Sequence, residues 1–298
     1  MTLSGRQFTL TAGGHEATVV EVGAGLRRYA RDGVDVTCSY PADALAPKCC
    51  GATLVPWPNR LRAGKYAFDG TDLQLALTEP ATGNAIHGLG RWERWSLVDQ
   101  DAASVSLELD IVPQTGWPFE LSARVTYALD AGSGLTVTAT ATNTGSGRAP
   151  FGAGFHPYLA TPALDRTAVR LPAATRLLLD ELQIPVGSEP VEGTPYDLRD
   201  GRPLGALRMD DAFTDLQVID GRGVAEVRTP HGGARVWFDA AFGHLQVFTL
   251  ENFPGSDTAG VAVEPMTCAP DAFNSGAGLM VLEPGERWSA SWGITPLD

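Results

Sequence analysis

The 298-residue sequence has no apolar stretch close to the roughly 20 residues that a membrane-spanning helix requires. Its first residues also lack the basic start and continuous apolar run of a secretory signal peptide. No segment concentrates Lys and Arg, and the formal net charge is -13, from 22 basic and 35 acidic side chains. A surface of this sign repels phosphate backbones and anionic lipid. We therefore expect a cytoplasmic protein whose partner is neither a nucleic acid nor a membrane.

Cysteine is scarce, and none of the four cysteines belongs to a C-x-x-C pair of the kind that binds structural zinc. Cys49 and Cys50 are adjacent, which is an awkward geometry for a mutual bridge. We predict that these two residues, with Cys38 and Cys268, are free and mostly buried thiols. A chain of this length buries about 75% of its surface on folding, so it needs neither a metal nor a disulfide for stability.

Long helical patterns are nearly absent, because Pro or Gly interrupts every extended run with apolar spacing of three and four residues. Short alternating runs rich in Val, Thr and aromatic residues recur instead, and such period-two alternation is typical of half-buried strands. Turns containing Gly separate them. The clearest runs are residues 104–109, 124–129, 135–140, 234–238, 244–248 and 287–292. We predict an all-β protein, a large antiparallel β-sandwich.

Residues 185–208 are polar and contain four prolines. They are either a linker between two domains or a long excursion within one domain. Strand-like runs resume afterwards with no change in composition, which favours the second interpretation. We therefore predict a single domain over residues 1–298.

Residues 56–61 carry two prolines, which exclude a central strand and place Trp57 and Arg60 on a stiff loop. In one interpretation, Arg60 is paired with a surface carboxylate. In the other, Trp57 covers a sugar face and Arg60 beside it donates hydrogen bonds to the sugar hydroxyls. The sequence alone does not separate these interpretations.

Two histidines have glycine neighbours. His87 precedes Gly88, where the backbone bends sharply or something approaches closely, although an ordinary surface loop would also fit. His156 shares its strand parity with Gly152 and Gly154, so we predict an open glycine floor beside the imidazole, where a ligand ring gains room. Phe151, Ala153 and Phe155 would form the opposite, buried face. We expect Pro157 to end that strand.

Glu264 follows Val261, Ala262 and Val263 in an apolar run, and Pro265 comes directly after it. In a strand Glu264 shares a face with Ala262, and we expect Pro265 to stop the ladder. A carboxylate in this position is either ion-paired or held for proton transfer. Partial burial would raise the pKa of Glu264 toward neutrality and make it a better base at working pH.

These segments together resemble the aldose 1-epimerase, or galactose mutarotase, family, and the match runs over nearly the whole chain. Each motif is short, but their order and spacing make the combination specific. The motifs are Asn59-Arg60, Asn84-Ala85-Ile86-His87-Gly88, Gly154-Phe155-His156-Pro157-Tyr158, Met209-Asp210-Asp211-Ala212-Phe213 and Val263-Glu264-Pro265.

The resemblance implies a single large β-sandwich with the site on the concave face of one sheet. It assigns Glu264 as general base, His156 as general acid and His87 as a histidine that orients the sugar. It also implies that Arg60 and Asp210 hold sugar hydroxyls, with Asn59 and Trp57 beside them.

The reaction implied is the exchange of the α and β anomers of a free aldose, without a metal or other cofactor. A carboxylate near His156 would raise the pKa of the imidazole, so we expect a bell-shaped pH profile with its basic limb at or above pH 7. Residues 91–95 and 250–260 differ from galactose-specific members and look closer to a divergent bacterial branch.

Three other interpretations of the same residues remain. His87, His156 and Glu264 form a two-histidine, one-carboxylate set of the kind that ligates non-haem iron, although such sites usually draw two ligands from one short stretch. A carbohydrate-binding module or sugar sensor would use the same pocket, but has no need of a complete acid–base pair. A phosphosugar epimerase is disfavoured by the acidic charge and by the lack of added Arg near the motifs.

Overall fold

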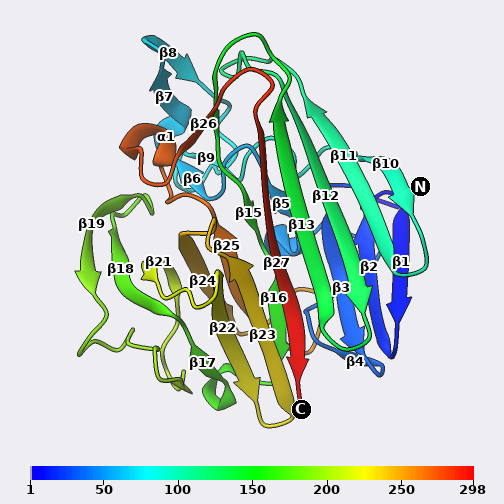
Figure 1. Ribbon diagram of the computed structural model, residues 1–298. Coiled ribbons are helices and arrows are strands. Elements are labelled where there is room, and N and C mark those ends of the chain that lie inside the picture. The colour runs from blue at the N-terminus through cyan, green and yellow to red at the C-terminus, as the bar shows by residue number, and fades with distance from the viewer. Residues whose placement is uncertain (1) are drawn as a thin grey trace.

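The computed structural model describes residues 2–298, and most of them lie in antiparallel strands. The larger sheet within this range has nine strands. Figure 1 shows its C-terminal strand β27 lying beside β13. In spatial order the strands are β10 (Ser96–Gln100), β11 (Ser104–Ile111), β12 (Leu121–Asp130), β13 (Gly134–Asn143), β27 (Arg287–Leu297), β23 (Gly232–Asp239), β22 (Arg222–Thr229), β17 (Ala168–Arg170) and β20 (Arg202–Pro203).

The second sheet has eight strands and carries the residues singled out above. Its central strand β25 pairs with β24 on one side and with both β15 and β16 on the other. The strands are β19 (Pro185–Pro190), β18 (Ala173–Leu179), β21 (Asp210–Leu216), β24 (His244–Leu250), β25 (Ala259–Met266), β15 (Gly154–Phe155) and β5 (Thr53–Leu54), with β16 (Tyr158–Thr161) on β25.

The remaining elements are small. The N-terminal strands form a four-stranded sheet, three short pairs flank the sandwich, and the α-helix α1 has four residues. They are β1 (Gln7–Ala12), β2 (His15–Val20), β3 (Gly25–Arg31), β4 (Val34–Asp35), the pairs β6 (Arg60–Leu61) with β9 (Ala85–Ile86), β7 (Lys65–Phe68) with β8 (Thr71–Gln74) and β14 (Ala149–Phe151) with β26 (Met280–Leu282), α1 (Ala272–Ser275), and the 3-10 turns η1 (Pro47–Cys49), η2 (Arg62–Gly64) and η3 (Leu164–Arg166). No helix within residues 2–298 is long and apolar enough to cross a membrane.

The core is one continuous cluster of buried residues that the two sheets share. Phe155 of the eight-stranded sheet and Trp292 of the nine-stranded sheet meet there, with their ring centroids 5.2 Å apart. Val261 and Val263 of β25 belong to this cluster, whereas Ala262 belongs to a second, smaller one. The strand alternation therefore turns Glu264 away from the main core, because residues two apart share a face.

The all-β prediction is confirmed, and each of the six clearest alternating runs lies inside a strand. All four cysteines are free, and three of them are buried. Residues 185–208 contribute β19 to one sheet and β20 to the other, rather than forming a structureless connection.

Two expectations about prolines have different outcomes. Pro157 does separate β15 from β16, as expected. The expectation that Pro265 ends its strand is wrong, because β25 continues to Met266, which lies opposite both His244 and Gly154. Pro265 lies where the partner ladder is interrupted between β15 and β16, and such a position tolerates a missing N–H donor.

Candidate active site

A cavity of about 400 Å³ lies on the face of the eight-stranded sheet that is turned away from the main core. This volume is within the usual range for small-molecule sites. Strands β21, β24 and β25 form its floor, and loops before β6, after β9 and around η1 form its walls. It is lined by Lys48, Cys49, Asn59, Arg60, Thr78, Glu79, Pro80, Ala81, Ile86, His87, Arg91, His156, Tyr158, Asp210, Gln246, Phe248 and Glu264.

Glu264 and His156 are neighbours in this cavity. Oε1 of Glu264 lies 3.3 Å from Nε2 of His156, and the two side chains are only 2% and 8% exposed. Oε2 of Glu264 and Nδ1 of His156 are buried without a hydrogen-bond partner. Because buried polar atoms in native proteins nearly always have partners, the unpaired Oε2 in a cavity wall is suited to accept a hydrogen bond from a bound hydroxyl.

Burial shifts the pKa values of Glu264 and His156 in opposite directions. It raises the pKa of the Glu264 carboxyl well above 4.5, and the negative charge of Asp210 adds to this shift while Arg60 opposes it. Burial also lowers the pKa of the His156 imidazole from 6.5 to about 3. The expectation that a nearby carboxylate would raise the histidine's pKa is therefore wrong, because desolvation of the buried imidazolium outweighs the attraction.

His87 is held in a defined orientation beside the pair. It adopts a positive φ of 64° and Gly88 follows with a φ of 70°, which is the sharp bend expected from the sequence. The backbone N–H of Asn59 donates to Nδ1 of His87 over 3.2 Å. An acceptor Nδ1 places the proton of a neutral imidazole on Nε2, which is then a donor. The His87 and His156 rings meet edge to face, with centroids 5.5 Å apart.

Burial lowers the pKa of His87 well below 6.5, and the positive charges of His156, Arg91 and Arg60 act in the same direction. His87 is 6% exposed and is therefore not an ordinary surface loop histidine. It is a neutral hydrogen-bond donor at neutral pH.

Arg60 and Asp210 belong to hydrogen-bonded networks that fix their positions. The guanidinium of Arg60 donates from Nε and Nη2 to the two carboxylate oxygens of Glu79, over 2.8 and 2.9 Å. Nε2 of Gln246 donates to Oδ1 of Asp210 over 2.7 Å, and Oε1 of Gln246 accepts from Nδ2 of Asn59 over 3.2 Å. These polar side chains are therefore preorganised, which lowers the entropic cost of binding a small polar ligand.

Comparisons with known proteins agree with this arrangement. The family model described as Aldose 1-epimerase matches residues 6–295. The chain belongs to the aldose 1-epimerase family. The resemblance stated from the sequence motifs is therefore confirmed.

Relatives in this family include an uncharacterized protein, YihR of Escherichia coli K12, which is 33% identical over 96% of this chain and 92% of its own length. Human galactose mutarotase is 32% identical over 67% of this chain and 59% of its own length. The fold is that of a GalM/aldose epimerase homologue from C. elegans, with a TM-score of 0.86 at 17% identity over 98% of this chain and 99% of that chain.

Six of the seven residues that the sequence predicted for the epimerase site line the cavity; the exception is Trp57. The prediction for Trp57 is wrong. Its side chain is 3% exposed and packs in the main core, where its ring centroid lies 5.7 Å from that of Phe273 and 6.3 Å from that of Trp117. The two flanking prolines fix the loop as expected, but a large indole gains more from core burial than from the cavity wall.

The predicted glycine floor is also wrong. A Cβ built on Gly154 would come within 2.7 Å of Cβ of Pro58, and one built on Gly152 within 2.5 Å of Sγ of Cys268. Neither glycine lines the cavity. They are small because other chain segments pack tightly against them, not because a ligand needs the space.

Several cavity residues were missed by the sequence reasoning. Gln246 and Glu79 orient Asp210 and Arg60, and Arg91 and Lys48 add positive charge to the walls. Only Gln246 had a usable signal, a polar residue on the cavity face of an alternating strand. Among residues 2–298 no group of three His, Cys, Asp or Glu side chains is arranged to hold a metal ion.

Proposed function

We propose that this family member is an aldose 1-epimerase that interconverts the α and β anomers of a free aldose. The observation that carries the proposal is the pair formed by Glu264 and His156, whose Oε1 and Nε2 atoms are 3.3 Å apart in the wall of one cavity. Anomer exchange requires one proton to leave the C1 hydroxyl and another to reach the ring oxygen. A paired carboxyl and imidazole supply both functions.

The proposed cycle uses a single proton on the pair. Because the pKa of Glu264 is raised and that of His156 is lowered, this proton resides on the carboxyl before the sugar binds. Moving it to His156 yields a carboxylate and an imidazolium with no change in total charge. In this form Glu264 takes the proton from O1 while His156 gives one to the ring oxygen, and the C1–O5 bond breaks to give the free aldehyde.

The cycle is completed by rotation about the C1–C2 bond. The ring oxygen then attacks the other face of C1, the imidazole recovers its proton from the attacking hydroxyl, and Glu264 returns one to O1. Arg60, Asp210, Asn59 and His87 would hold the remaining hydroxyls, because all four side chains line the cavity. Each positioned acid or base contributes about 10²–10⁴ in rate.

Polarimetry of freshly dissolved α-anomers tests the proposal. The purified protein should accelerate the loss of optical rotation of at least one aldose, neutral or charged, above the spontaneous rate. The Glu264→Gln variant, at the same concentration, supplies the background. Tight sugar binding with no acceleration for any aldose would identify a binding protein and contradict the proposal.

A further inference from the structure

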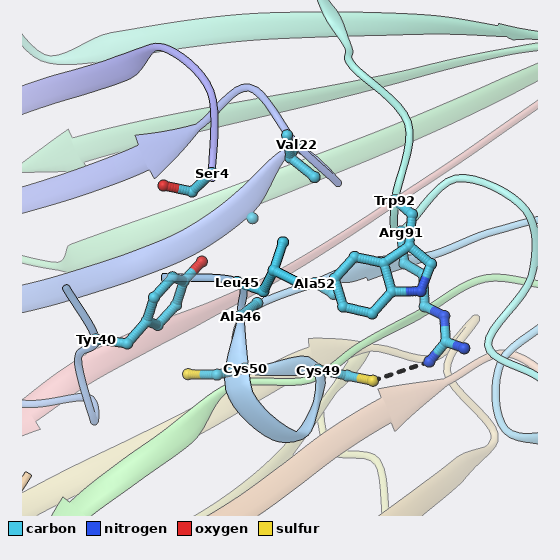
Figure 2. Close-up of a pocket in the computed structure, with 11 residues that line it drawn as sticks. Ser4, Val22, Tyr40, Leu45, Ala46, Cys49, Cys50, Ala52, Arg91 and Trp92 are labelled. Atoms are coloured by element: carbon cyan, nitrogen blue, oxygen red, sulfur yellow. Dashed lines mark hydrogen bonds between the residues drawn. The ribbon is translucent and has the colours of Figure 1, made fainter. Parts of the chain in front are cut away.

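Arg91 is a buried cation that forms no ion pair, although Glu79 is near enough for the charge of Arg91 to lower the pKa of that carboxyl. It lies in the loop between β9 and β10, is 9% exposed, and is the only buried arginine among residues 2–298. No carboxylate in this range forms an ion pair with it, although most other arginines here have one. Its Nη1 lies 3.0 Å from Sγ of Cys49 (Figure 2), and its guanidinium lies 5.2 Å from the centroid of the Trp92 ring.

Such a side chain is costly unless something compensates its charge. A thiol and an aromatic ring are weak partners for a guanidinium, whose five donors are suited to oxygen anions. Arg60 in the same cavity shows the contrast, because Glu79 binds it through two hydrogen bonds. Burying an unpaired charge opposes folding, so a retained one in a cavity wall points to a ligand that brings the opposite charge.

A second cation lies on the same side. Lys48 lines the cavity, is exposed, and has no ion-pair partner in the described chain. The loop that carries Lys48 is hydrogen-bonded to His156, which lies between β15 and β16. The N–H of Gly51 donates to the carbonyl of His156 over 2.8 Å, and the N–H of His156 donates to the carbonyl of Ala52 over 3.2 Å. Cys49, the neighbour of Lys48, is the residue that contacts Arg91.

Tyr158 also connects His156 with Lys48. Its ring stacks on His156 with centroids 4.9 Å apart, and its hydroxyl donates to the carbonyl of Lys48 over 3.1 Å. The unpaired cations therefore flank the wall that holds the proposed acid. In an aldohexose ring, the carbon next to the ring oxygen on the side away from C1 is C5, and it carries C6. A substituent on C6 therefore lies on the ring-oxygen side of the sugar and points away from the ring, beside the atom that His156 would protonate.

We infer that the preferred substrate is an aldohexose with an oxyanion on C6, bound by Arg91 and Lys48. This inference rests on the proposed epimerase function and adds the substrate class. A C6 substituent leaves the ring hydroxyls free for Arg60, Asp210 and Asn59. Discrimination follows from the buried guanidinium, because a neutral sugar leaves it unpaired and an anionic sugar does not. The local cations also offset the repulsion that the net charge of -13 exerts on an anion.

The test compares kcat/KM for α-to-β exchange of glucose, glucuronate and glucose 6-phosphate, followed by polarimetry or by exchange NMR at equilibrium. The wild-type protein should prefer at least one anionic sugar to glucose by tenfold or more, and the two anionic probes separate a carboxylate from a phosphate site. Arg91→Gln should reduce this preference at least tenfold, and Arg91→Lys should restore part of it. Arg94→Gln, which removes an exposed charge from the same loop, is the matched control for charge and should keep the preference.

The outcomes separate the two proposals. If no sugar exchanges faster than its spontaneous rate, the epimerase function itself fails. If glucose is turned over as well as or better than both anionic sugars, the function stands and the inference is overturned. A preference that survives in a folded Arg91→Gln variant would also overturn it, because the anion would then be bound elsewhere. Thermal melting of each variant establishes that it is folded.

Discussion

Glu264 of β25 lies directly opposite His156, which falls between β15 and β16. Gly154 is opposite Met266 in the β15–β25 ladder and Tyr158 is opposite Ala262 in the β16–β25 ladder, so the antiparallel register between them places residue 156 at residue 264. The ladder is interrupted here: no residue of β15 or β16 pairs with β25 between those two positions, and the backbone hydrogen bond there runs from the N–H of Val263 to the carbonyl of Pro157 over 3.3 Å. The interruption leaves the two side chains to meet in the cavity wall, where Nε2 and Oε1 are 3.3 Å apart.

We predict that Glu264→Gln lowers kcat by two or more orders of magnitude while sugar binding is retained. The amide preserves the shape of the side chain but cannot accept the proton from O1. Steady-state polarimetry measures kcat, and calorimetric titration measures binding. Glu226→Gln is the control, because that carboxylate pairs with Arg228 and Arg235 away from the cavity. Near-normal mutarotation by Glu264→Gln would remove this carboxyl from the mechanism.

The same substitution should stabilise the fold, and increasingly so as pH rises. Burial raises the pKa of Glu264 above the 4.5 of an exposed carboxyl, so the folded state binds more protons than the unfolded state above that pH. Wild-type stability therefore falls as pH rises from 4.5 toward the folded pKa, whereas the amide does not titrate. We expect a higher Tm for the variant than for the wild type at pH 8, and little difference at pH 4. Thermal melts at both values test the sign; a gain independent of pH would show that the carboxyl does not titrate in this window.

Activity should not depend on a divalent metal. His87 already accepts a hydrogen bond at Nδ1 from the Asn59 backbone, and Glu264 faces His156, so these side chains are engaged with protein partners. Prolonged EDTA treatment followed by dialysis should leave the mutarotation rate unchanged. Metal analysis of the purified protein accompanies the assay. A rate that disappears with EDTA and returns with one particular metal would favour the two-histidine, one-carboxylate centre instead.

Gly154→Val should destabilise the protein rather than selectively block sugar binding. Its Cβ would approach Cβ of Pro58 to 2.7 Å and the carbonyl oxygen of Pro265 to 3.4 Å, so the strand would have to shift. Overpacking of this kind costs about 1–3 kcal/mol or more. Gly147→Val is the matched control, because a Cβ there meets nothing within 4 Å. Equal Tm values for the two variants would mean that the contacts around Gly154 are looser than described.

The sequence predicted those features of the fold and the site that depend on local residue patterns. Period-two alternation located the strands, and the parity of Val261, Val263 and Glu264 predicted the side of the sheet on which the carboxyl lies. The registry that brings His156 opposite Glu264 is a long-range property, and no local spacing encodes it. Trp57 was misplaced because a stiff loop does not reveal which way its ring turns. Arg91 lies in residues 91–95, which differ from galactose-specific members, but no pattern there predicted that its side chain is buried in the cavity wall.

The pH profile is the sharpest test of the proposed roles. The active form carries one proton on the Glu264–His156 pair, so the pH limits belong to the pair as a whole. A second proton binds only in strong acid, because burial lowers the pKa of His156 to about 3. The single proton is lost as the pH rises through the raised pKa of Glu264, so kcat/KM should fall on the alkaline side of that pKa. His156→Asn should be about 10²–10⁴ slower and lose the alkaline limb, because Glu264 then acts alone and works better once it is ionised. His244→Asn, a buried histidine outside the cavity, is the matched control and should keep the wild-type profile. A His156→Asn enzyme that keeps both its rate and its alkaline limb would transfer the role of acid to His87.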